Sequence, residues 1–388
     1  MKIAYITPRF HPFKGGAEQN LLALSTRVAK LGFDSTVLTT NARFNNEKLI
    51  KEEFYKGLRI IRHWAPTEAL YAGFYPQLLP HLLLNNYDII HSSGIGFFWR
   101  EFCLILKKLT SGKNTRFIVT PHGPFLAATS DKGFRAIIRK IGNRILRIYI
   151  NWLYDEFIAV NPKQHVWMEA LYKINPVKII NIPNGIDEAY IAPHLIEHKP
   201  DDKVVITYMN RMEEYKGIQQ VLKAINKILE IPAANKNFIF YIMGRPGGYT
   251  KTLESMVRDM QLESHTKFIF SPEDKERDEI FYKESQINIL PSQWEATGIT
   301  LLEAMAKGNI IITTEQNEAA DILIKEGENG FIYSYDEIDK LVEGLSWLLK
   351  TPELRERMRK ESLEMSSKFT WESVVKIYVD LLNNIKYK

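Results

Sequence analysis

Two loops in the second half of the chain carry residue types that suit a diphosphate. Arg211 and Lys216 follow the apolar run 204–209 and precede a helical pattern that starts near Gly217. An arginine can donate two parallel hydrogen bonds to phosphate oxygens, and a lysine adds a compact positive charge. Two basic residues in a loop are also common on any solvated surface, so this pair alone leaves both interpretations open.

The second loop adds two acids and a helix start. After the apolar run 287–290, the chain places Glu295 before a glycine and Glu303 eight residues later. Backbone N–H groups at a helix start favour an anion, and here they belong to Gly298, Ile299 and Thr300. Glu303 stands among apolar residues, and an unpaired buried carboxylate is costly. We therefore expect Glu303 to have a partner, either ribose hydroxyls or an arginine elsewhere in the fold.

The elements that position these loops follow from short apolar runs that alternate with helical patterns. Strands are expected at 2–7, 33–39, 58–61, 88–91, 116–120, 157–160 and 178–182, and again at 204–209, 238–243, 267–270, 287–290 and 309–313. Such alternation predicts an α/β fold with parallel sheets. In open α/β sheets, ligands bind outside the carboxyl ends of the strands, which is where both loops lie.

The length of 388 residues exceeds what one hydrophobic core usually serves. The strand–helix pattern restarts after the polar stretch 197–203, so we expect two doubly wound domains, 1–192 and 203–368, that face a central cleft. The tail 369–388 has apolar residues at helical spacing and needs a surface to cover.

Charge and cysteine content narrow the class of protein. Residues 1–190 carry a net charge of +11 and the remainder −6, so the first half is expected to meet something anionic: nucleic acid, a membrane surface or a phosphorylated small molecule. The single cysteine, Cys103, excludes a disulfide framework and a cysteine-based metal site, and it fits a cytoplasmic location. We find no export signal and no run long enough to span a membrane.

Glu295 and Glu303, followed by Ala-Met-Ala-Lys-Gly, resemble the Glu-x7-Glu motif of glycosyltransferase family 4 (group 1), whose members are retaining enzymes of the GT-B fold. The resemblance covers nearly the whole chain. Further matches, in the family's order, are Gly-Gly-Ala-Glu at 15–18, His-Gly at 122–123, Ile-Pro-Asn-Gly-Ile-Asp at 182–187, Arg211 with Lys-Gly at 216–217, and Gly-Glu-Asn-Gly-Phe at 327–331.

The resemblance implies an architecture and a reaction. Two Rossmann-like domains are implied, with 1–192 on the acceptor side, 203–368 binding a nucleotide-diphosphate sugar, and the helix 369–388 returning to the N-terminal domain. The sugar would pass, with retention, to a glycan, lipid-linked or small-molecule acceptor, as in polysaccharide biosynthesis. No cofactor and no metal are expected, because no Asp-x-Asp motif stands in a suitable loop.

Carried over by position, the family implies a role for each matching residue. Arg211 and Lys216 would neutralise the diphosphate, Glu303 would hold the ribose hydroxyls, and Glu295 would lie by the sugar ring. The residues expected to cradle phosphate are Gly15, Gly16, Gly298, Ile299 and Thr300, and His122 would contact the sugar near the reacting centre. The family usually has glycine at the position of Asn210, which adjoins this site. Because of this departure from the family's pattern, the donor base and sugar stay unassigned.

A basic amphipathic helix is expected in the first half. Its cations are Lys132, Arg135, Arg139, Lys140, Arg144 and Arg147, and its apolar positions include Phe134, Ile137, Ile138, Ile141, Ile145, Leu146 and Ile148. One interpretation is peripheral contact with an anionic bilayer, since relatives in the family often glycosylate lipid-linked acceptors. The other is a helix whose apolar face is packed in the core and whose basic face is solvated.

Two other functions remain as alternatives. A nucleotide-sugar epimerase of the same fold would share the donor site, and its product would differ. A basic protein that binds membrane or nucleic acid without catalysis would not need Glu295 or Glu303. The combination of Arg211 and Lys216 with both glutamates favours glycosyl transfer, with no nucleic acid as partner.

Overall fold

The computed structural model describes residues 1–13, 15–41, 43–44, 47–65, 74–126, 133–199, 202–296 and 298–386. The chain forms two compact units, Met1–Asn184 with Trp371–Lys388, and Gly185–Thr370. The sequence expectation ended the first domain at 192. Residues 185–192 instead belong to the second unit, because Ile186 N–H donates to the carbonyl of Phe369 and Ala192 N–H to that of Ala306.

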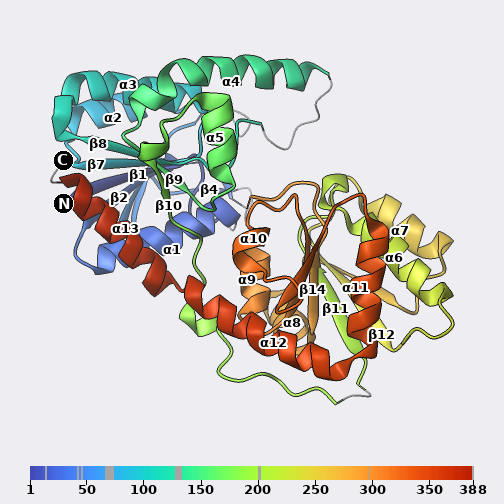
Figure 1. The fold of residues 1–388 in the computed structure, drawn as a ribbon. Helices are drawn as coiled ribbons and strands as arrows, with labels where there is room; N and C mark the ends of the chain where they lie inside the picture. Colours follow the sequence, from blue (N-terminus) through green and yellow to red (C-terminus); the bar gives the residue numbers. More distant parts are fainter. Residues whose placement is uncertain are drawn as a thin grey trace. The chain divides into compact units, whose positions relative to one another are not determined.

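The first unit is built on an eight-stranded sheet with the order β10-β9-β8-β7-β1-β2-β6-β5 (Figure 1). Every neighbouring pair is parallel except β5 with β6. The strands are β1 Lys2–Ile6, β2 Asp34–Thr40, β5 Glu52–Tyr55, β6 Leu58–His63, β7 Ile89–Ser93, β8 Arg116–Thr120, β9 Glu156–Ala159 and β10 Ile179–Asn181. A separate antiparallel pair comprises β3 Arg43–Phe44 and β4 Glu47–Lys48.

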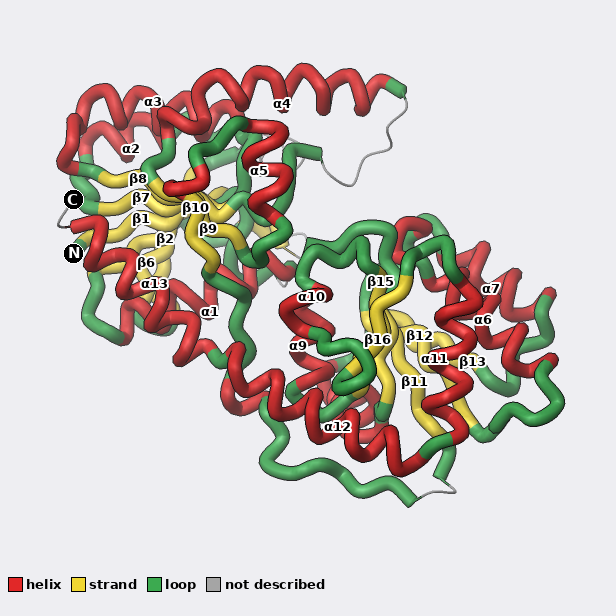
Figure 2. The backbone as a smooth tube through the Cα atoms, in the orientation of Figure 1, coloured by secondary structure: helices red, strands yellow, loops and turns green. Residues whose placement is uncertain are grey.

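Helices cover both faces of this sheet (Figure 2). They are α1 Gly16–Lys30, α2 Leu78–Leu84, α3 Phe98–Ser111, α4 Phe134–Leu153, α5 Gln164–Tyr172 and α13 Trp371–Lys386. Successive residues of a strand point to opposite faces. Ala4 and Ile6 accordingly join the core under α2, α3 and α4, whereas Ile3 and Tyr5 join the core under α1 and α13. The sheet is therefore buried on both sides, as parallel sheets usually are.

The C-terminal helix α13 is tied to the middle of this sheet by a buried polar contact. The hydroxyl of Tyr378 lies 2.8 Å from His91 Nδ1, and His91 Nε2 lies 2.9 Å from the hydroxyl of Thr120. Burial lowers the pKa of His91 to about 3. The imidazole is therefore neutral at pH 7, with one nitrogen donating and the other accepting.

This buried histidine predicts acid sensitivity. The folded pKa of about 3 lies below the ordinary value of 6.5, so the unfolded chain binds the proton more readily than the folded protein does. The neutral His91 therefore stabilises the folded protein above pH 6.5, and this stabilisation is lost as the pH falls towards 3. We expect His91 to lower the free energy of unfolding by about 3 kcal/mol between pH 7 and pH 4. Urea unfolding at both pH values checks this. His91→Gln should flatten the dependence, and an equal pH dependence in the variant would contradict the assignment.

The second unit has a six-stranded sheet with the order β13-β12-β11-β14-β15-β16, parallel throughout. Its strands are β11 Val204–Met209, β12 Phe238–Gly244, β13 Thr266–Phe270, β14 Ile287–Leu290, β15 Ile310–Thr314 and β16 Gly330–Tyr333. The order reverses between β11 and β14, and such a switch point is where open α/β sheets bind ligands. In the first sheet the order reverses in the same way between β1 and β7.

Helices flank the second sheet in the described part of the unit. They are α6 Ile218–Glu230, α7 Thr250–Asp259, α8 Asp274–Arg277, α9 Ile299–Met305, α10 Ala320–Leu323, α11 Ile338–Lys350 and α12 Pro352–Ser366. All of them except α8 contribute residues to the core of the unit. Two doubly wound α/β units with parallel sheets confirm the expected fold class. None of the helices in the described part of the chain has the length and apolar character that crossing a membrane requires.

Candidate functional site

The loop after β11 holds Arg211 at the carboxyl edge of the second sheet. Its backbone N–H donates to the side chain of Asn210 over 2.8 Å, and its carbonyl accepts from the hydroxyl of Tyr208 over 2.7 Å. Burial raises the pKa of Tyr208 well above its usual value, so this hydroxyl stays protonated. The exposed Arg211 guanidinium donates from Nη2 to the hydroxyl of Tyr215 over 3.0 Å. The backbone of Arg211 is therefore fixed while its charge faces solvent.

Lys216 and Gly217 bring this loop against the loop that follows β14. Gly217 has a φ of 75°, and a Cβ built on it would lie 1.8 Å from the carbonyl oxygen of Pro291. Only glycine allows so close an approach of two backbones at that φ. The Gln293 N–H adds a second link by donating to the Tyr215 carbonyl over 2.8 Å. The two loops are thus joined directly over the switch point between β11 and β14.

The central contact of the site joins Lys216 to Glu295. Lys216 Nζ lies 2.5 Å from Glu295 Oε2, and the two side chains are 6% and 17% exposed. The backbone of Glu295 is held as well, because its carbonyl accepts from Glu318 N–H over 2.8 Å. An ammonium has three N–H donors, of which Glu295 takes one. The arrangement is a nearly buried cation, held by a carboxylate, at the edge where a ligand is expected.

Gly298 lies beside Glu295 at the start of α9. It has a φ of 63°, and a Cβ built on it would lie 2.7 Å from Leu290 Cδ2 and 3.4 Å from Glu295 Cγ. Ile299 and Thr300 form the first turn of α9, whose N–H groups have no acceptor within the helix itself. Glu303, on the same helix, is partly buried between buried neighbours. The sequence prediction of an acid in apolar surroundings therefore agrees with its position.

The other predicted residues belong to the first unit, at the carboxyl edge of its sheet. Gly15 caps α1 and Gly16 begins it, after β1. His122 follows β8 with a φ of 62°, and its Nε2 lies 3.0 Å from the hydroxyl of Ser93 at the end of β7. Burial, and then the positive charge of Arg100, lower the pKa of His122 to about 4. The imidazole is therefore neutral at pH 7.

Behind His122 lies a buried ion pair that the sequence analysis missed. Arg100 donates to the carbonyl of Ser93 over 2.7 Å and to that of Gly94 over 2.5 Å, and it lies 3.7 Å from Glu101. Glu101 accepts from the Tyr149 hydroxyl over 2.5 Å, and both members of the pair are fully buried. The available signal was an Arg-Glu pair inside the apolar stretch 97–106. Arg100 fixes the turn after β7 and thereby the partner of His122.

The predicted site residues therefore fall into two sets. Arg211, Lys216, Glu295, Gly298 and Glu303 lie in the second unit, with a direct contact between Lys216 and Glu295. Gly15, Gly16 and His122 lie in the first unit.

The cations of the predicted basic helix are distributed over α4 and the residues before it. Lys132 lies outside the described residues, and Arg135 is in α4 with a side chain that is not described. Arg139 is partly buried, and Lys140 and Arg144 are exposed.

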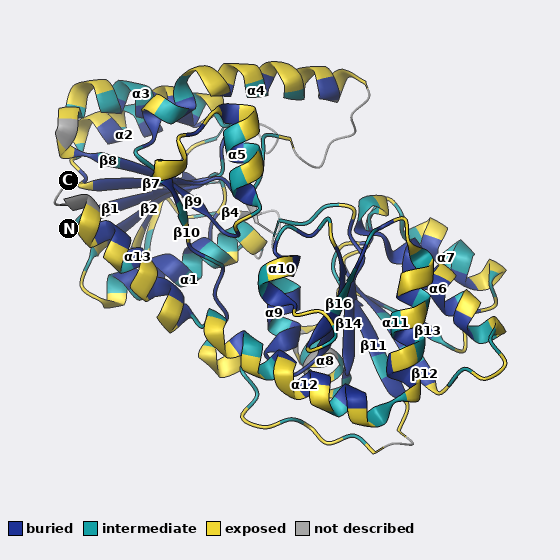
Figure 3. Ribbon diagram, viewed as in Figure 1, coloured by how far each residue is buried: buried dark blue, intermediate teal, exposed yellow. Residues whose placement is uncertain are grey.

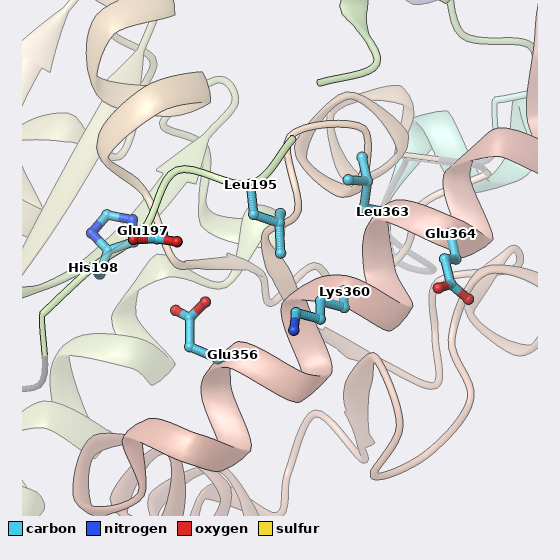
Figure 4. Close-up of a pocket in the computed structure, with 7 residues that line it drawn as sticks. All are labelled: Leu195, Glu197, His198, Glu356, Lys360, Leu363 and Glu364. Carbon is cyan, nitrogen blue, oxygen red and sulfur yellow. The ribbon is translucent and has the colours of Figure 1, made fainter. Parts of the chain in front are cut away.

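A separate pocket of the second unit contains none of these residues. Figure 4 shows it along α12, where Leu195, His198 and Lys360 line a hollow of about 610 Å³. Among the described residues, no group of three or more His, Cys, Asp or Glu side chains is placed to hold a metal ion. The switch point of the second unit therefore remains the candidate site.

Comparisons with known proteins match both units of the chain. The model of the family "Glycosyl transferases group 1" matches residues 194–365, and that of "Glycosyltransferase Family 4" matches residues 14–190. A GDP-mannose:cellobiosyl-diphosphopolyprenol alpha-mannosyltransferase of Komagataeibacter xylinus is 22% identical, over 99% of this chain and 93% of the relative.

Two solved structures share the fold. Sucrose-phosphate synthase of Thermosynechococcus elongatus has a TM-score of 0.78 at 18% identity, over 100% of this chain and 99% of that one. HepE of Anabaena, in complex with UDP and glucose, has a TM-score of 0.74 at 15% identity, over 99% of this chain and all of the other.

Proposed function

The chain belongs to the group 1 glycosyltransferases and has their GT-B fold, and from this membership we propose that its donor is a nucleotide-diphosphate sugar bound at the switch point of the second unit. The sugar passes to a glycan, lipid-linked or small-molecule acceptor, with retention of the anomeric configuration. The observation that carries the proposal is the nearly buried Lys216–Glu295 pair, with the Arg211 guanidinium on the same loop.

The chemistry follows from where charge develops. When the glycosidic bond to the donor breaks, negative charge grows on the diphosphate and positive charge grows at the anomeric carbon. Lys216 and Arg211 stabilise the diphosphate, and Lys216 needs little reorganisation because Glu295 already holds it. The acceptor hydroxyl attacks from the face that the leaving group vacates and gives its proton to the departing diphosphate oxygen, which requires no protein nucleophile. With cations in these positions, the proposed reaction proceeds without a metal or other cofactor.

The remaining residues orient the donor. Glu303 accepts hydrogen bonds from the ribose hydroxyls, and Glu295 lies by the hydroxyls of the transferred sugar. The N–H groups of Ile299 and Thr300, after Gly298, bind phosphate oxygens. His122, neutral at pH 7, contacts the donor sugar, and Gly15 and Gly16 contact phosphate. These roles rest on the family resemblance and on the positions of the residues at sheet edges.

The ligands and donors of similar proteins support the choice of ligands. HepE is described in complex with UDP and glucose, and the mannosyltransferase of Komagataeibacter xylinus is named for a GDP-mannose donor and a diphosphopolyprenol acceptor. We extend a nucleotide-sugar donor and a lipid-linked or glycan acceptor to this chain, in a pathway of polysaccharide biosynthesis.

A thermal-shift panel tests the donor. UDP, GDP, ADP and dTDP are added singly, each at about 100 times its expected dissociation constant, where binding adds about 2.7 kcal/mol to stability. A shift of several degrees with one nucleotide names the donor base. The matching sugar conjugate is then incubated with acceptors, with and without EDTA, and NMR reports the anomeric configuration of the product. An isomerised sugar nucleotide would indicate an epimerase, and no shift with any nucleotide would refute the donor site.

Replacing Glu303 by alanine should weaken nucleotide binding. Hydrogen bonds to a charged group contribute about 1.5–3 kcal/mol, so the dissociation constant should rise about 10- to 100-fold. Isothermal titration with the nucleotide selected by the panel measures it. Glu343→Ala, at an exposed position of α11, is the matched control and should bind as the wild type does. An unchanged affinity in Glu303→Ala would remove Glu303 from the ribose site.

A further inference from the structure

Helix α4 has two apolar faces, and only one of them is packed. Leu146, Ile150 and Leu153 lie in the core of the first unit. A second stripe at spacings of three and four residues is exposed along most of the helix (Figure 3). It comprises Phe134, Ile137, Ile138, Ile141, Ile145, Ile148 and Trp152, with Phe134 74% and Ile148 81% exposed. The interpretation that packs these isoleucines in the core is therefore wrong: of the apolar positions predicted for this helix, only Leu146 is buried.

The charge of this helix has one sign. Lys140, Arg144 and Arg147 are exposed at spacings of four and three residues, which places them in a row along one flank of the apolar stripe. The sequence of α4 contains no Asp or Glu. The stripe and its basic flank together are named the α4 surface.

The neighbouring helix α3 also exposes apolar side chains and no acid. It packs against α4, and its Phe98, Phe102 and Leu109 share one exposed face. The acid of α3 is Glu101, which is fully buried and accepts from the Tyr149 hydroxyl of α4. Neither helix therefore exposes a negative charge.

These observations identify the kind of partner. Single exposed apolar residues are ordinary, but seven large ones in a row on one helix mark an interaction surface. A second copy that packed α4 against α4 would bring like charges together, whereas an anionic bilayer accepts apolar side chains at its acyl boundary and cations at its headgroups. The other face of α4 packs in the core of the first unit, where α4 contacts α3 and α5, so the apolar stripe is left free to face the plane of a bilayer.

We infer that the α4 surface docks this glycosyltransferase on an anionic lipid bilayer. The isoleucines enter the headgroup–acyl boundary, and Lys140, Arg144 and Arg147 bind anionic headgroups. The evidence for docking is the exposure and charge of α4 alone. The inference rests on the proposed function only for the purpose of docking, which is to bring the enzyme to a lipid-linked acceptor.

Vesicle flotation of the full chain tests this inference. Phosphatidylcholine vesicles with and without about 30% phosphatidylglycerol are the probes, and each basic residue near an anionic surface raises the partition coefficient about fivefold. Wild type should float with the anionic vesicles only. The triple variant Lys140→Gln/Arg144→Gln/Arg147→Gln should partition about 100-fold less, and Ile137→Ser/Ile141→Ser/Ile148→Ser at least about tenfold less.

Matched controls remove equal numbers of charges and apolar side chains elsewhere. Lys223→Gln/Lys251→Gln/Arg258→Gln changes three exposed cations of the second unit, and Leu31→Ser/Ile50→Ser/Val177→Ser changes three exposed apolar residues of the first. Both should float as the wild type does.

The inference would be overturned if the wild type did not float with anionic vesicles at low salt, or if the α4 variants floated as well as the wild type. It would also be overturned if sedimentation velocity showed a dimer that the isoleucine variant abolishes, while vesicles bound no protein. The nucleotide panel, run without lipid, tests the donor proposal separately from vesicle binding, so either proposal can fail without the other. Because α4 is in the first unit, far-UV circular dichroism and the urea unfolding midpoint, both equal to those of the wild type, show that a variant is folded.

Discussion

Replacing Lys216 by alanine should lower kcat about 10²- to 10³-fold, the usual cost of removing one preorganised donor from developing negative charge. The change removes the nearly buried ammonium that Glu295 holds at the switch point. Because the charge on the diphosphate grows as the bond breaks, the loss should fall mainly on kcat and less on KM for the donor. Steady-state kinetics with the donor named by the nucleotide panel measure both constants.

Two further variants separate catalysis from folding. Lys216→Ala also leaves Glu295 without this partner, so its free energy of unfolding must be measured beside its rate. Lys223→Ala, an exposed lysine on α6, is the matched control and should retain the wild-type rate. Lys216→Arg keeps a positive charge and should recover part of the lost rate. A folded Lys216→Ala enzyme that turns over at the wild-type rate would remove Lys216 from the mechanism.

Replacing Arg100 by methionine should destabilise the first unit by about 3–5 kcal/mol, the usual cost of removing one partner from a buried ion pair. The change leaves the carbonyls of Ser93 and Gly94 without their guanidinium donor and Glu101 without its cation. The pKa of His122 should rise from about 4, because Arg100 is the second cause of its lowering, after burial. Urea unfolding and an NMR titration of the histidines measure the two effects.

The histidine titration distinguishes a positioning role from a purely structural one. Arg147→Met, at an exposed position of α4, is the control and should change neither the stability nor the pKa of His122. If Arg100→Met lost stability but left that pKa at about 4, the residue would support the fold without setting the charge state of His122. Wild-type stability would contradict the buried pair altogether.

Much of the fold could be predicted because buried parallel strands are continuous apolar runs. Residues 204–209 and 287–290 are the strands β11 and β14 with the predicted bounds. Two edge strands were missed for physical reasons. β5 is antiparallel and half-exposed, so its residues alternate, and β16 is only four residues long and begins with a glycine.

The candidate site was predictable as a set of residue types, but not as a geometry. The sequence indicated a basic loop after one strand and, after another strand, an acid, a glycine that precedes a helix and a second acid on that helix. Lys216 and Glu295 are 79 positions apart, and they meet because β14 pairs with β11 rather than with β13. Arg100 and Glu101 were missed because a buried ion pair leaves no periodic signal on its helix.

What the sequence by itself determined is composition and periodicity: alternating strands and helices, a basic first half, and the motifs that resemble a glycosyltransferase family. What only the tertiary structure decided is which side of each element is buried. Helix α4 shows the difference, because its two apolar stripes look alike in sequence, yet Leu146 and Ile150 are buried and Ile141 and Ile148 are exposed. Burial depends on neighbours that come from distant parts of the chain, and no local pattern contains that information.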